Sequence, residues 1–193
     1  MLLPFPISLP GKKPDDVHEM IAQGNALLRG AGLPDARFEL VAPPEAGAAF
    51  RGAELRLILP EKSLEEMIRR EAVRQAAQHG AKVTAARLVW AGAGEKAVAL
   101  DAQISAGMFL ASVDLKLRAV LRAGDPDLLR VGELGFDAGS GMFANMARAV
   151  LEPHLKKALG AEFSLSNLAG RRVRWSAFGR ENGALSGSLR FEE

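Results

Sequence analysis

Apolar and polar residues alternate most regularly between residues 108 and 123. Val113, Leu115 and Leu117 lie on one side of this pattern and are separated by charged residues. Because successive side chains of a β-strand point to opposite faces of a sheet, the pattern predicts a long strand with one dry face and one largely solvated face. It is the longest strand that the sequence predicts.

Further strands flank this stretch on both sides. Residues 82–90 and 97–105 precede it with a Gly-rich turn between them, and residues 129–137 follow it after a turn at 124–127. Strands joined by connections this short pair as antiparallel neighbours. The sequence therefore predicts four consecutive antiparallel strands.

Shorter strands are predicted toward both ends of the chain, at residues 37–41, 54–59, 171–178 and 185–191. The last two are separated by Asn182-Gly183, and Asn-Gly between alternating runs is a strong hairpin signal. We therefore expect the chain to close with a β-hairpin.

Three segments have apolar positions spaced three or four residues apart, as in amphipathic helices. They begin near residue 17, near residue 63 and near residue 140, and the third extends to about residue 159. Pro153 lies inside the third segment and predicts a kink there, because its ring clashes with the preceding turn.

Two of the helix starts carry cap signals. Asp15 or Asp16 precedes the first helix and can accept from its free amides. Ser63 and Glu66 match a capping box, which predicts Ser63 as the cap of the second helix.

The order of these elements predicts an α+β fold. We expect a strongly curved antiparallel β-sheet wrapped around one or two long helices. Residues 1–50 are predicted to form an N-terminal appendage with an irregular lead, a short helix and a short strand. Residues 51–193 are predicted to form the α+β main domain.

Composition narrows the chemistry further. The chain has 193 residues, 48% of them hydrophobic, and its 25 basic and 23 acidic side chains leave a net charge of +2. This length and apolar fraction are typical of a globular protein that buries its own core. The absence of cysteine excludes disulfides, cysteine–zinc clusters and thiol nucleophiles. So small a net charge gives no reason to expect a nucleic-acid partner.

The first residues do not match a targeting signal. They are apolar but broken by prolines, and no basic region precedes them. No apolar run in the chain approaches the ~20 residues that span a bilayer. We therefore expect a cytoplasmic location, or an envelope location if a leader has been removed.

Residues 139–144, Gly-Ser-Gly-Met-Phe-Ala, have the spacing of a dinucleotide-binding fingerprint. That fingerprint requires parallel βαβ units, whereas the strands before it are predicted to be antiparallel, so we interpret it as a tight turn into a helix. His18, His79 and His154 lack metal-ligand spacing. With no nucleophile elbow or paired carboxylates either, we predict a protein that is not an enzyme and has no cofactor or metal.

Methionine and phenylalanine gather where the third helix and the longest strand begin. Such side chains form adaptable apolar surface for flexible ligands, and a plain packed core would explain them equally well. We expect an apolar groove between that helix and the inner face of the long strands. Its predicted lining is Phe109, Val113, Leu115, Leu117, Met142, Phe143, Met146 and Val150.

A basic stretch, residues 171–175, reads Arg-Arg-Val-Arg-Trp. One interpretation is a strand with Val173 and Trp175 facing inward and the arginines facing water. The other gives Arg172 and Arg174 a role in meeting a polar headgroup at the mouth of the groove, with peripheral membrane contact.

The order of elements from residue 54 to 193 resembles the bacterial tubular lipid-binding (TULIP-like) proteins, some of which have no assigned function. The resemblance rests on the strand and helix at 55–77, the alternating run from 98 to 131, and the stretch from the third helix through Phe163-Ser164-Leu165 to the closing hairpin. It implies a long helix lying in a highly curved antiparallel sheet, with an apolar gap that takes acyl chains.

Two functional hypotheses follow. The first is binding, and possible transfer, of a hydrophobic ligand such as a lipid, driven by burial of apolar surface. The second is a structural or interaction module with a filled core that docks a partner or self-associates as a homo-oligomer through residues 1–50. The Pro-rich apolar start favours the second hypothesis, because such a segment is poorly ordered unless it packs on something.

Overall fold

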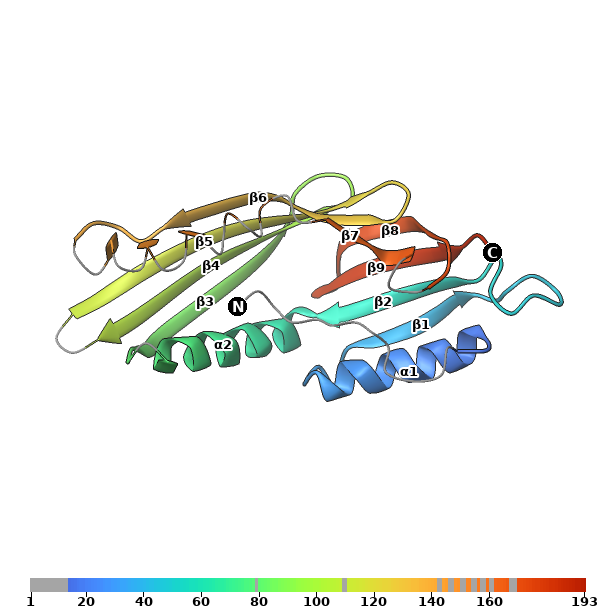
Figure 1. Cartoon of the computed structure of the whole chain (residues 1–193), viewed down its shortest axis with the longest axis horizontal. Helices are drawn as coiled ribbons and strands as arrows, with labels where there is room; N and C mark the ends of the chain where they lie inside the picture. Colours follow the sequence, from blue (N-terminus) through green and yellow to red (C-terminus); the bar gives the residue numbers. More distant parts are fainter. Residues whose placement is uncertain are drawn as a thin grey trace.

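Two antiparallel sheets, joined end to end along the long axis of the molecule, make up most of the chain (Figure 1). This computed structural model describes residues 14–78, 80–108, 111–141, 144–145, 148–149, 152–153, 156, 159, 162–166 and 170–193. Neither sheet closes into a barrel. The α+β class with antiparallel sheets and helices, predicted from the sequence, is confirmed.

The four-stranded sheet combines the two ends of the chain in the order β1-β2-β9-β8. Its strands are β1 (Arg37–Ala42), β2 (Glu54–Pro60), β8 (Val173–Glu181) and β9 (Ala184–Phe191). The closing hairpin predicted from Asn182-Gly183 is confirmed, because both residues have positive φ, as a tight hairpin turn of this kind requires.

The five-stranded sheet follows chain order, β3-β4-β5-β6-β7. Its strands are β3 (Lys82–Gly92), β4 (Ala97–Met108), β5 (Ala111–Gly124), β6 (Leu128–Asp137) and the short β7 (Glu162–Ser164). The four predicted antiparallel strands are confirmed, with boundaries within a few residues of the prediction. In Figure 1 these long strands extend well beyond the four-stranded sheet.

Two helices are described over their whole length. Helix α1 (Val17–Gly30) lies beside β1, and Asp16 caps it by accepting from the Glu19 amide at 2.8 Å. Helix α2 (Glu61–Gln78) contacts β2 and β3.

The capping box predicted at Ser63 is wrong, because α2 already begins at Glu61. Ser63 lies inside the first turn and donates its hydroxyl to Asp35 Oδ2 at 3.2 Å instead. The helix start is held by the β8–β9 hairpin, where the Gly183 carbonyl accepts from the Glu61 amide and Arg180 pairs with the Glu61 carboxylate.

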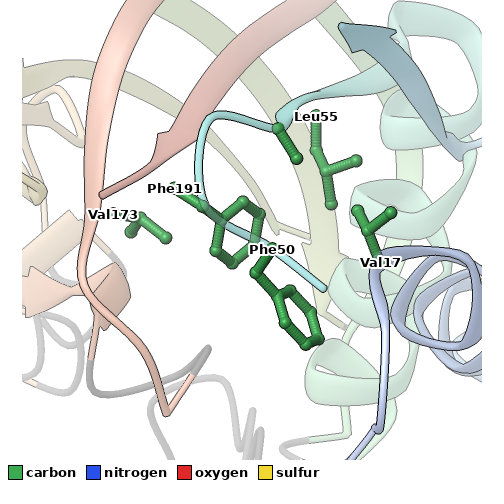
Figure 2. Packing of buried hydrophobic residues seen from close by; sticks show 6 residues of the cluster. Val17, Phe50, Leu55, Val173 and Phe191 are labelled. Atoms are coloured by element: carbon green, nitrogen blue, oxygen red, sulfur yellow. The ribbon is translucent and has the colours of Figure 1, made fainter. Parts of the chain in front are cut away.

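Residues from the first fifty positions form part of both larger core clusters. In the first cluster Val17 and Phe50 pack with Leu55, Val173 and Phe191 (Figure 2). The second cluster consists of Leu33, Ala36, Leu64, Trp90, Val98 and Leu185. Since β1 also pairs with β2, the segment from residue 14 to 50 is integrated into the four-stranded sheet.

The turn between β5 and β6 joins the two sheets. Trp175 of β8 donates its backbone amide to the Pro126 carbonyl at 2.8 Å and its indole N–H to the Leu128 carbonyl at 2.9 Å. Asp127 in the same turn is buried and accepts from the Ser164 hydroxyl at 2.6 Å and from the Ser166 amide at 2.8 Å. The two bonds from Trp175 attach this end of the long sheet to β8, and the bonds to Asp127 tie the turn to β7 and the residue that follows Leu165.

Candidate ligand-binding face

The alternation predicted for the long strand is present in β5. Val113, Leu115 and Leu117 are half-buried, whereas the residues between them, Asp114 and Lys116, are exposed. The structure thus brings these three predicted groove residues together on one face of the five-stranded sheet, as period-two geometry requires.

Neighbouring strands extend this face. Ile104 of β4 lies opposite Leu115, Phe136 of β6 lies opposite Leu117, and Leu134 lies opposite Ala119. All are half-buried. We call this set the inner strip: Ile104, Val113, Leu115, Leu117, Leu134 and Phe136.

The inner strip is distinct from the described core. Helix α2 packs its Leu64, Met67 and Ile68 near Trp90 and Val98, toward the end of the sheet that meets β8. Within the described ranges, no residue of the inner strip belongs to any of the three clusters of buried residues. The strip therefore extends beyond the apolar surface that α1 and α2 cover.

Five predicted groove residues, Phe109, Met142, Phe143, Met146 and Val150, lie outside the described residues. The described positions of the same segment include Asn145, Ala149, Glu152 and Lys156, which are helical and exposed. Their spacing of three or four residues places them on one solvated helix face.

Apart from a small buried apolar cluster where β4 begins and β5 ends, the opposite face of the long sheet is polar and crossed by ion pairs. Arg118 pairs with Asp101 at 3.2 Å, and Arg122 pairs with Glu133 at 2.8 Å. A shallow pocket of about 390 Å³ lies where Gly135 leaves a gap opposite Arg118. The charged side chains on this face are exposed to solvent, whereas the inner strip on the other face is apolar.

The two predicted headgroup residues are located on the other sheet, near the end of the chain. Arg172 pairs with Glu193 and Arg174 pairs with Glu192, each at 3.2 Å. Val173 and Trp175 between them are buried, as the strand interpretation of this stretch requires. The structure therefore does not group these arginines with the inner strip.

Sequence reasoning missed three members of the inner strip, Ile104, Leu134 and Phe136. A signal was present, because each alternates with polar or small residues in a predicted strand. What the sequence lacked was the register, which decides that Phe136 lies opposite Leu117.

Histidine and carboxylate side chains form no metal site in the described part of the chain. There, no group of three or more His, Asp or Glu side chains is placed to hold a metal ion. Hydrogen bonds from Ser164 and Ser166 lower the pKa of Asp127 against the opposing effect of burial, and one oxygen of that carboxylate accepts both bonds in the turn. None of the described helices is long and apolar enough to cross a bilayer.

Comparison with known proteins places the chain in no family. No family model matches the chain. Neither the curated proteins nor the solved structures contain a significant match to it.

Proposed function

We propose that this protein binds a hydrophobic ligand, such as the acyl chain of a lipid, along the inner strip, and that it is not an enzyme. One observation carries the proposal: six apolar side chains from three adjacent strands form a half-buried surface that α1 and α2 do not cover. Apolar burial is worth about 25 cal/mol per Å² before ordering costs, so an acyl chain lying along such a surface would gain substantially.

In this proposal the sheet curves as in the TULIP-like proteins, and the resemblance stated above suggests the kind of ligand. The second wall of the groove would come from Met142, Phe143, Met146 and Val150. The proposal does not need a headgroup contact from Arg172 or Arg174, because both arginines already have carboxylate partners.

The first test is native mass spectrometry of the purified protein before and after delipidation. We expect an additional mass that disappears on delipidation and returns when a long-chain fatty acid is added. A single ligand-free mass in every sample, including the one with added fatty acid, would contradict the proposal.

The alternation in β5 supplies a matched pair of variants for the second test. Leu117→Gln places an amide in the inner strip, whereas Lys116→Gln makes a similar change on the opposite face. We expect Leu117→Gln to weaken binding of a fluorescent fatty acid by about tenfold, since burying an unpaired amide costs on the order of 1–3 kcal/mol. Lys116→Gln should bind as the unaltered protein does. Equal binding by both variants would place the ligand elsewhere.

A further inference from the structure

Arg171 lies in a surface pocket that shares no residue with the inner strip. The pocket measures about 480 Å³ and is lined by residues 47–51, Arg171, Glu192 and Glu193. The guanidinium carbon of Arg171 lies 3.7 Å from the centre of the Phe50 ring, which is a close cation–π contact.

The base of this contact is rigid. Phe50 is only 2% exposed, and its ring packs against Phe191 with 5.5 Å between the ring centres. Figure 2 shows Phe50 among Val17, Leu55 and Phe191. The backbone amide of Arg171 donates to the Ser166 carbonyl at 3.2 Å. The guanidinium is thus held in place before any ligand arrives, which lowers the entropic cost of binding.

Every other arginine around the pocket has a carboxylate partner. Arg51 pairs with Glu45 at 2.8 Å, while Arg172 and Arg174 pair with Glu193 and Glu192. Of the two arginines that line the pocket, Arg51 is therefore paired, and Arg171 has no carboxylate partner among the described residues.

Arg171 itself makes no ion pair with any residue that the structure describes. Its Nε is buried and has no hydrogen-bond partner. Buried polar groups are nearly always paired in native proteins, because an unpaired N–H loses its hydration without compensation. Because Arg171 also lines the pocket, its guanidinium is the group that an acceptor from outside the chain would meet there.

We propose that this pocket binds an oxyanion, a carboxylate or phosphate group, with Arg171 as its principal ligand. The planar guanidinium donates hydrogen bonds that match the oxygens of both groups. Glu192 and Glu193 do not prevent this, because Arg174 and Arg172 offset their charges. The oxyanion could belong to a free small molecule or to a lipid headgroup, and the site does not depend on the function proposed for the inner strip.

The test is a titration of the full chain with sodium acetate and with inorganic phosphate at constant ionic strength. We expect saturable binding of at least one of them, weakened by at least about tenfold in Arg171→Gln, as the loss of a charge-assisted hydrogen bond predicts. Arg118→Gln is the control, because its exposed side chain is paired with Asp101 on the other sheet, and it should change the affinity less than about twofold. Binding that is equal in Arg171→Gln and the unaltered protein would overturn the proposal.

A second arm distinguishes the two sources of the oxyanion. It measures binding to phosphatidylcholine vesicles with and without phosphatidylglycerol. Binding of acetate or phosphate without vesicle binding assigns the site to a free anion. Binding only to the anionic vesicles, lost in Arg171→Gln, assigns it to a headgroup. No binding in either arm overturns the proposal.

If Arg171→Gln does not fold, the unaltered protein still gives a decisive result. The Nε–H signal of Arg171 in a nitrogen-15 NMR spectrum should shift saturably with acetate or phosphate, but not with chloride at the same ionic strength. A signal that does not move with either oxyanion would contradict the proposal.

Discussion

Gly187 shows how tightly single residues are constrained where β8 and β9 pair. A Cβ atom at this position would lie 2.7 Å from the Trp175 ring, and that ring is fixed by its hydrogen bond to Leu128. We expect Gly187→Ala to lower the free energy of unfolding by about 1–3 kcal/mol, the usual cost of overpacking. Chemical denaturation measures this change.

Gly179 on the neighbouring strand is the matched control. A Cβ there meets no atom within 4 Å, and its φ does not require glycine. Gly179→Ala should leave stability unchanged or raise it by a few tenths of a kcal/mol, because alanine restricts the unfolded chain. Similar destabilisation by both substitutions would show that the Trp175 ring is free to move.

Asp127 makes the stability of the protein depend on pH. Hydrogen bonds, chiefly from the Ser164 hydroxyl and then from Ser166, hold its pKa below the ordinary value. A lowered folded-state pKa means that the stabilisation is complete above the unfolded pKa of about 3.9 and is lost as the pH falls through the folded-state pKa.

Asp127→Asn tests this dependence. A neutral amide oxygen can accept both bonds but holds them more weakly than a carboxylate oxygen, so we expect a loss of about 1–3 kcal/mol at neutral pH. The difference between the variant and the unaltered protein should shrink as the pH falls below about 4. Urea denaturation at a series of pH values measures both effects. A difference that stays constant down to the lowest pH would assign the effect to packing.

At the scale of elements, the start of α1 is stabilised by hydrogen bonds between residues that are close in the sequence. Asp16 accepts from the Glu19 amide, and the Glu19 carboxylate accepts from the Asp15 amide at 2.7 Å. Asp16→Ala should cost about 1 kcal/mol of stability, whereas Asp16→Asn should retain most of it because asparagine caps equally well. Urea denaturation of the two variants measures the difference, and equal losses would mean that charge, rather than capping, stabilises this end.

The elements themselves were largely predictable from the sequence because their signals are local. Alternation predicts β5 and the turn chemistry of Asn182-Gly183 predicts the closing hairpin. The cap at Ser63 failed because the β8–β9 hairpin extends the helix to Glu61 through a long-range contact. Local patterns cannot contain such a contact.

The pairing of distant elements was not predictable. Glu54 of β2 lies opposite Arg190 of β9, and no local pattern connects them. On its other side β9 pairs with β8, and this places Glu192 and Glu193 beside Arg174 and Arg172. Sequence reasoning therefore found the apolar face on β5 but could not foresee that these arginines have partners and that Arg171 has none in the described part of the chain.

At the scale of the whole molecule, the two tryptophans distinguish the connection between the sheets from ordinary core packing. Trp175 is 7% exposed and Trp90 is 8% exposed, so the two side chains are almost equally buried. The indole N–H of Trp175 donates to the carbonyl of Leu128 at the start of β6, whereas that of Trp90 has no partner among the residues that the structure describes. Replacing each tryptophan by phenylalanine removes a similar amount of apolar surface. The difference between the two variants therefore measures the hydrogen bond between the sheets.

We expect Trp175→Phe to be more destabilising than Trp90→Phe by about 1 kcal/mol, because only the first substitution removes a hydrogen bond. Denaturation followed by circular dichroism measures both variants. A larger loss in Trp90→Phe would mean that packing around α2, rather than the turn between β5 and β6, limits the stability of the molecule. Equal losses would mean that the bond to Leu128 contributes nothing, so that the bond from the Trp175 amide to Pro126 and the packing between the sheets hold them together.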